Sequence, residues 1–129
     1  MKPVILLVDD EEDLVSVLTD AIHLTMPGYE AVGSTSVEDA EKALANVSAG
    51  QLSLVCVDHR LGGRTGLEFL EEVRRRFPEV PSILFTGQAS VSVEERAHQV
   101  GARVLWKPIR LSQWIGEVQS MLSGPVAAI

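Results

Sequence analysis

The chain has 129 residues, a hydrophobic content of 46% and a formal net charge of −7, which together indicate one globular domain with an aliphatic core. The negative charge argues against direct binding of nucleic acid, because phosphate contacts need clustered Lys and Arg. The longest apolar run, residues 4–8, is too short to cross a membrane, and the single cysteine, Cys56, excludes an internal disulfide. We therefore expect a cytoplasmic domain without membrane contact.

Short apolar segments alternate along the chain with segments in which apolar residues recur at helical spacing. The expected strands are residues 4–8, 29–33, 54–57, 82–85 and 102–106, and the apolar positions of the expected helices span residues 14–22, 40–47, 67–77, 91–100 and 111–122. The first of these strands is apolar throughout, as in a strand buried on both faces. Five strand–helix units predict an α/β fold, with a five-stranded parallel sheet and helices on both faces.

Polar side chains follow four of the five expected strands. Asp9 and Asp10 follow the first strand, Asp58 the third, Thr86 the fourth and Lys107 the fifth. Because the carboxyl ends of parallel strands lie along one edge of a sheet, we expect these side chains to converge.

The chemistry of this set points to phosphoryl transfer. Three carboxylates at one place repel one another, and Mg2+ relieves that repulsion through oxygen ligands. A carboxylate beside Mg2+ is also a competent nucleophile for phosphorus. Asp58 would then carry an aspartyl phosphate, while Lys107 neutralises the phosphoryl oxygens and the Thr86 hydroxyl donates a hydrogen bond to one of them.

In this order and at these strand ends, the chain resembles the receiver domain of bacterial two-component response regulators; the motifs that carry the resemblance are Asp9-Asp10, Asp58, Thr86 and Lys107-Pro108. The resemblance covers residues 2 to about 122, so we expect a receiver domain at residues 1–123 and a tail or the start of a linker at residues 124–129. It implies a flavodoxin-like sheet of order 2-1-3-4-5. It also implies that Asp58 takes its phosphoryl group from a histidine kinase or a phosphotransfer protein.

The same resemblance implies a ligand set for Mg2+, namely Asp10, Asp58 and the backbone carbonyl of Arg60, with Asp9 assisting. A receiver domain is a phosphoacceptor and not an enzyme, because it promotes only its own phosphotransfer and a slow autodephosphorylation. Arg60 and Gln88 stand at the positions that tune this hydrolysis in the family. We expect the downstream protein target or output domain to lie outside this chain.

The family's conformational switch is only partly present. Thr86 is expected to move toward the phosphoryl group, and an aromatic residue three positions before the lysine is expected to turn inward. That position holds Val104, and Trp106 lies two residues further on. By strand alternation Trp106 is on the same side as Val104 and would substitute for the aromatic, but the pattern favours a packed core tryptophan. The resemblance also implies a cis bond between Lys107 and Pro108.

Other readings stay open. A pseudo-receiver, which binds partners without phosphorylation, is favoured by the missing aromatic and opposed by the intact acid, threonine and lysine set. A phosphatase of the haloacid-dehalogenase type needs an Asp-x-Asp motif after the first strand, which here reads Asp9-Asp10-Glu11-Glu12. A flavodoxin-like cofactor binder shares the fold, but its first loop is rich in hydroxyl groups whereas this one is acidic. Each acid, taken alone, could also be a residue at a helix N-terminus, where the helix dipole favours negative charge.

Overall fold

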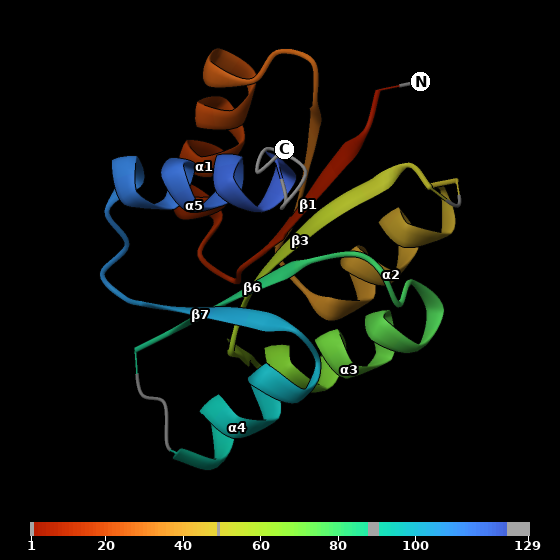
Figure 1. Cartoon of the computed structure of the whole chain (residues 1–129), viewed down its shortest axis with the longest axis vertical. Helices are drawn as coiled ribbons and strands as arrows, with labels where there is room; N and C mark the ends of the chain where they lie inside the picture. Colours follow the sequence, from red (N-terminus) through yellow and green to blue (C-terminus); the bar gives the residue numbers. More distant parts are fainter. Residues whose placement is uncertain (1, 49, 88–90, 124–129) are drawn as a thin grey trace.

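The computed structural model describes residues 2–48, 50–87 and 91–123, and the predicted tail at residues 124–129 lies outside them. Five parallel strands form one sheet in the order β2-β1-β3-β6-β7, which confirms the expected topology. Their bounds are Val4–Val8 for β1, Glu30–Ser34 for β2, Leu52–Asp58 for β3, Ser82–Thr86 for β6 and Ala102–Trp106 for β7. The sheet forms the centre of the molecule (Figure 1).

Helices cover both faces of the sheet. On one face lie α1, Glu12–Thr25, and α5, Leu111–Ser123; on the other lie α2, Val37–Ala45, α3, Gly66–Arg76, and α4, Val91–Gln99. Strand β1 explains why the apolar runs are continuous. Val4, Leu6 and Val8 pack on the side of α2, α3 and α4, while Ile5 and Leu7 pack on the side of α1 and α5. Successive side chains of a strand face opposite ways, so a strand between two helical layers must be apolar at every position.

Capping hydrogen bonds fix where helices α2 and α3 begin. Helix α2 begins after Ser36, whose hydroxyl accepts a hydrogen bond from the Asp39 N–H. Helix α3 begins with a full capping box between Thr65 and Glu68, which we did not predict. Of the nine residues of α4, only Ala97 is buried. Helix α4 is therefore the most weakly anchored of the helices, as its sparse apolar pattern indicates.

A small hairpin interrupts the loop between β3 and α3. Its two strands are β4, Arg60–Leu61, and β5, Arg64–Thr65, which pair antiparallel. The turn between them contains Gly62, whose φ of +74° is readily adopted only by glycine. Two-residue strands carry no periodic signal, so the sequence pattern did not predict them. Among the described residues, every helix falls short of the length and hydrophobicity that crossing a membrane requires.

Candidate functional site

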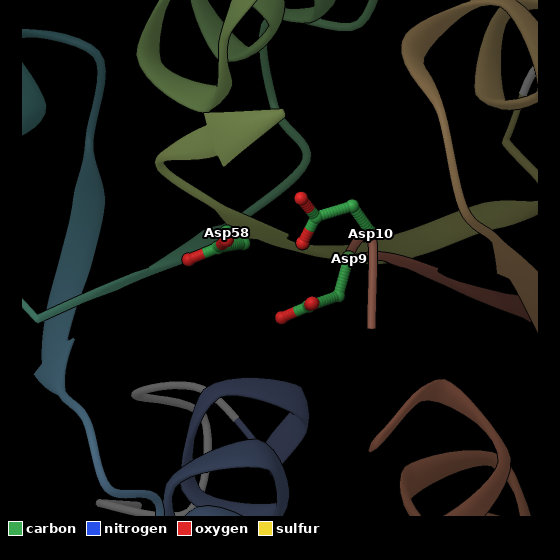
Figure 2. A group of neighbouring side chains, drawn as sticks. All are labelled: Asp9, Asp10 and Asp58. Carbon is green, nitrogen blue, oxygen red and sulfur yellow. The ribbon is translucent and has the colours of Figure 1, made fainter. Parts of the chain in front are cut away.

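Three carboxylates meet at the carboxyl edge of the sheet. Asp9 and Asp10 follow β1, and Asp58 is the last residue of β3. Figure 2 shows the three side chains gathered at this edge, and one oxygen of each lies within 4.8 Å of the others. Asp9 and Asp58 are buried, with 1% and 6% of their surface exposed, whereas Asp10 is exposed. The cluster therefore combines two buried acids with one that opens to solvent.

The Lys107 ammonium joins this cluster from the end of β7. Its Nζ atom lies 3.1 Å from Oδ2 of Asp9 and 3.3 Å from Oδ1 of Asp58. It also lies 3.2 Å from Oε1 of Glu11. The sequence pattern does not predict this contact with Glu11. The Lys107–Pro108 bond is cis, as expected.

The burial of these groups shifts their protonation equilibria. Burial raises the pKa of Asp58, and the charge of Asp9 adds to the rise while Lys107 opposes it. Burial also raises the pKa of Asp9, against the hydrogen bond from the Glu11 N–H and the contact with Lys107. Burial disfavours the charged form of Lys107, but its hydrogen bond to Asp9 and the charge of Asp58 outweigh this and raise its pKa. The ammonium is thus held in its charged form between two acids.

The cluster opens into a cleft of about 520 Å³, lined by Asp10, Glu11, Asp58, His59, Arg60, Thr86, Gly87 and Lys107. Thr86 is buried at the end of β6, and its carbonyl accepts a hydrogen bond of 2.9 Å from the Lys107 N–H. This bond joins the end of β6 to the residue that follows β7. The lining thus includes the Thr86 hydroxyl, the cationic side chains of Lys107 and Arg60, and three carboxylates, those of Asp10, Glu11 and Asp58. Gln88, which we expected near it, lies outside the described residues.

The start of α3 contacts the backbone at the end of β3. The Gly66 N–H donates to the His59 carbonyl at 2.8 Å. A Cβ atom on Gly66 would lie 2.1 Å from the Asp58 carbonyl oxygen, so only glycine fits this position. His59 also donates its N–H to the Phe85 carbonyl. The Asp58 backbone is therefore confined from two sides.

The imidazole of His59 differs from an ordinary surface histidine. Its Nδ1 atom is buried and has no hydrogen-bond partner among the described residues. Burial and the nearby charge of Arg96 lower the pKa of His59. Alternation along β3 directs this side chain away from Asp58, and its electrostatic neighbours Arg96 and Glu68 lie on α4 and α3. The residue as a whole is half-buried.

Val104 and Trp106 differ in burial. Val104 is half-buried against the core layer of α2, α3 and α4. Trp106 has 52% of its surface exposed, so the expectation of a packed core tryptophan is wrong. The reason is position: Trp106 ends an outer strand, and α4 has few side chains that could cover it. Trp106 is the register partner of Thr86.

Comparisons with known proteins agree with this geometry. The family model of the response regulator receiver domain matches residues 5–119. The chain is 34% identical over 100 residues to the nitrogen assimilation regulatory protein NtrX of Azorhizobium caulinodans, a match that covers 76% of this chain and 21% of NtrX. The chain spans half or less of the length of the curated relatives that it matches.

Solved structures share the fold. A CheY-like receiver domain protein from Methanospirillum hungatei superposes with a TM-score of 0.86 at 21% identity, over 100% of both chains. The non-phosphorylated HemR receiver domain of Leptospira biflexa gives a TM-score of 0.81 at 26% identity, over 95% of both chains.

A five-stranded parallel sheet with acids, a threonine and a lysine at its carboxyl edge defines a phosphoacceptor class of α/β domain. The chain belongs to the response regulator receiver domain family. Receiver domains of this family are the phosphoacceptor modules of two-component signalling. Receiver domains bind Mg2+ at an acidic pocket, and the cluster of Asp9, Asp10 and Asp58 is such a pocket.

Proposed function

We propose that Asp58 is the residue that accepts the phosphoryl group. The observation that carries this proposal is the ion pair between Lys107 and Asp58, 3.3 Å apart within a cleft that also contains Thr86. Asp58 is buried at the end of a central strand, so its carboxylate is held in place and partly desolvated. A desolvated carboxylate beside a fixed cation is suited to attack on phosphorus.

The three carboxylates fit a hard divalent cation. Their oxygens lie close enough to share one ion, and exposed Asp10 leaves the position accessible from the cleft. Asp9, Asp10, Asp58 and the backbone carbonyl of Arg60 would hold Mg2+, with Asp9 in an assisting role. When bound, Mg2+ supplies positive charge beside the oxygens of the group being transferred.

The transfer step follows from the chain's own residues. An Oδ atom of Asp58 attacks the phosphorus of a phosphohistidine, the phosphorus–nitrogen bond breaks, and the imidazole leaves with its electron pair and takes up a proton. Lys107 moves its contact from the Asp58 carboxylate to an oxygen of the new phosphoryl group. The Thr86 hydroxyl donates a hydrogen bond to another of these oxygens. Positioning and charge neutralisation are the main demands of such a step.

The donor in this proposal is a histidine kinase or a phosphotransfer protein, and the signal passes to a downstream protein target or output domain. NtrX and the other curated relatives are regulatory proteins longer than this chain, which supports an output outside it. The single cysteine is buried and free, which suits a reducing, cytoplasmic compartment. Slow hydrolysis of the acyl phosphate, tuned by Arg60 at the cleft, would end the signal.

The switch in this proposal uses Thr86 and Trp106, because Val104 has no ring to move. Trp106 is exposed and lies opposite Thr86 in the ladder between β6 and β7. Thr86 and Trp106 are paired neighbours in this ladder. A shift of Thr86 toward the phosphoryl group would therefore displace Trp106 directly. Phosphorylation would bias a two-state equilibrium of this face.

Intact-mass spectrometry after incubation with acetyl phosphate or phosphoramidate tests the proposal. We expect one added phosphoryl group in the presence of Mg2+, none with chelator, and none in Asp58→Asn. The half-buried valine at position 104 favours one alternative, a pseudo-receiver that binds partners without phosphorylation. An unmodified mass under every condition, with the fold intact by circular dichroism, would decide for that alternative.

A further inference from the structure

The hairpin of β4 and β5 carries the Arg60 carbonyl, one of the groups proposed to hold Mg2+. Arg60 pairs with Thr65 across this hairpin. The bond from the Gly66 N–H to the His59 carbonyl flanks the pair, which makes it the kind of antiparallel pair without mutual hydrogen bonds. The Thr65 N–H donates instead to the Glu68 carboxylate at 2.9 Å. The Arg60 carbonyl is therefore directed out of the hairpin, and Arg60 lines the cleft of the acidic cluster.

The hairpin backbone has little of its own to fix its position. Of residues 60–65, only Leu61 is buried, and it packs in the core layer of α2, α3 and α4. The turn contains Gly62 and Gly63, both exposed, and a Cβ atom at either would meet nothing within 4 Å. Two consecutive glycines leave the backbone free to adopt many conformations. The position of the hairpin therefore depends on contacts that its side chains make.

Arg64 makes two such contacts, one to each of two helices. Its Nη2 atom lies 3.0 Å from Oε2 of Glu72 on α3. Its Nη1 atom lies 3.4 Å from Oε1 of Glu41 on α2. The rigid fork of a guanidinium allows both bonds at once. Because Arg64 pairs with Leu61, the residue next to Arg60, these ion pairs fix the part of the hairpin that carries the Arg60 carbonyl.

We propose that Arg64 is a positioning residue for the Mg2+ site, because it holds the hairpin where the Arg60 carbonyl faces the acidic cluster. The inference rests on the proposed Mg2+ ligands. Without the two ion pairs, the hairpin would spend part of its time in conformations that withdraw this carbonyl. The apparent Kd rises in inverse proportion to the competent fraction. Partly exposed ion pairs shift such an equilibrium by up to about fivefold each.

The sign of the effect separates positioning from charge. Arg64→Met removes a positive charge, which by itself would strengthen the binding of a cation. Loss of the two ion pairs has the opposite effect. We expect the Kd for Mg2+, measured by isothermal titration calorimetry on the unphosphorylated protein, to rise about fivefold. Arg64→Lys keeps the charge without the fork and should raise the Kd about twofold.

Arg103→Met is the matched control. Arg103 forms an ion pair with Glu117, and neither residue belongs to the hairpin or lines the cleft. The variant removes an equal charge and one ion pair, and it should change the Kd for Mg2+ less than about 1.5-fold. Circular dichroism confirms that each variant is folded.

The rate of phosphorylation by phosphoramidate distinguishes positioning from damage to the acceptor. At a Mg2+ concentration near the Kd of the natural chain, Arg64→Met should react more slowly. With Mg2+ at about 100 times the variant's own Kd, its rate should come within about twofold of the natural rate, because the ion selects the competent hairpin.

Three results would overturn the proposal while leaving the Mg2+ site in place. One is an unchanged or lower Kd in Arg64→Met, and another is an equal rise in Arg103→Met. The third is a slow rate of Arg64→Met that saturating Mg2+ does not restore. Absence of Mg2+ binding by the natural chain would be a different failure, since it would overturn the proposed ligand set and this inference with it.

Discussion

At the scale of single residues, Lys107 holds two buried carboxylates at once. In Lys107→Ala these acids lose their counter-charge. We expect the free energy of unfolding at pH 7 to fall by about 1–3 kcal/mol, less than for a fully buried pair because the lysine is partly exposed. Phosphorylation of Asp58 should continue in part, but the change in tryptophan fluorescence that the proposed movement of Trp106 would cause should be lost. Urea titration, intact mass and fluorescence measure the three effects.

Lys42 supplies the control for this variant, since it is an exposed lysine on α2. Lys42→Ala should leave stability, phosphorylation and fluorescence unchanged. If Lys107→Ala kept the full fluorescence response to phosphorylation, Lys107 would not be the group that reads the phosphoryl charge.

Cys56 predicts a pH dependence of stability. Burial raises the pKa of its thiol to about 12, and the Trp114 indole offsets this in part. The folded state therefore keeps the thiol protonated after the unfolded state has ionised. Its contribution to stability is present in full below about pH 8.5 and is lost as the pH rises toward 12, by up to about 1.4 kcal/mol per pH unit.

Urea unfolding between pH 7.5 and 10.5 measures this slope, and Cys56→Ala is the reference that lacks the thiol. The variant will be less stable at every pH because of the cavity that it leaves. Its stability should nevertheless decline less steeply with pH than that of the natural chain. Parallel declines would mean that the thiol ionises equally in the folded and unfolded states.

At the scale of elements, the first residue of α3, Gly66, lies in close contact with the end of strand β3. In Gly66→Ala the new Cβ would meet the Asp58 carbonyl oxygen, so strand or helix must move. We expect a loss of about 1–3 kcal/mol of stability and slower phosphorylation by phosphoramidate. Gly63→Ala is the matched control three residues earlier, because a Cβ there has open space around it. Equal behaviour of the two variants in urea titration and mass spectrometry would contradict a tight joint at Gly66.

The elements were predictable to different degrees. Strands β1 and β7 appear at the residues expected, because each is a compact apolar segment bounded by polar residues or glycine. Strand β3 proved longer than its apolar run, since pairing with β6 extends through Asp58. The exposure of Trp106 could not be predicted from its residue type. It depends on the position of β7 at the edge of the sheet and on how little of that strand α4 covers.

At the scale of the whole molecule, the acidic cluster opposes folding in the absence of a cation. Asp10 and Asp9 both act to raise the pKa of Asp58. We therefore expect Asp10→Asn to stabilise the metal-free protein, because it removes one repelling charge. In the natural chain, Mg2+ at 100 times its dissociation constant should add about 2.7 kcal/mol. Thermal unfolding with and without Mg2+ measures both effects.

Asp20→Asn is the control, as it removes an acid of α1 outside the cluster. It should leave the response to Mg2+ intact, whereas Asp10→Asn should abolish it. An undiminished response in Asp10→Asn would place the ion elsewhere.

Much of the site follows from topology. Once five strands are parallel, the residues after them must meet at one edge, so the meeting of Asp9, Asp58 and Lys107 could be expected from the sequence. The contact of Lys107 with Glu11 could not, because it depends on how the loop before α1 turns. The burial of the His59 Nδ1 atom likewise leaves no periodic signal in the sequence.

The ion pair between Lys107 and Asp9 joins residues 98 positions apart. During synthesis, Asp58 leaves the ribosome well before the lysine that neutralises it. A chain that stops short of residue 107 would contain the acceptor without its cation. The complete set of Asp9, Asp58 and Lys107 can thus form only after residue 107 has been synthesised, so a shorter nascent chain would hold its two buried acids without the cation that offsets their charge.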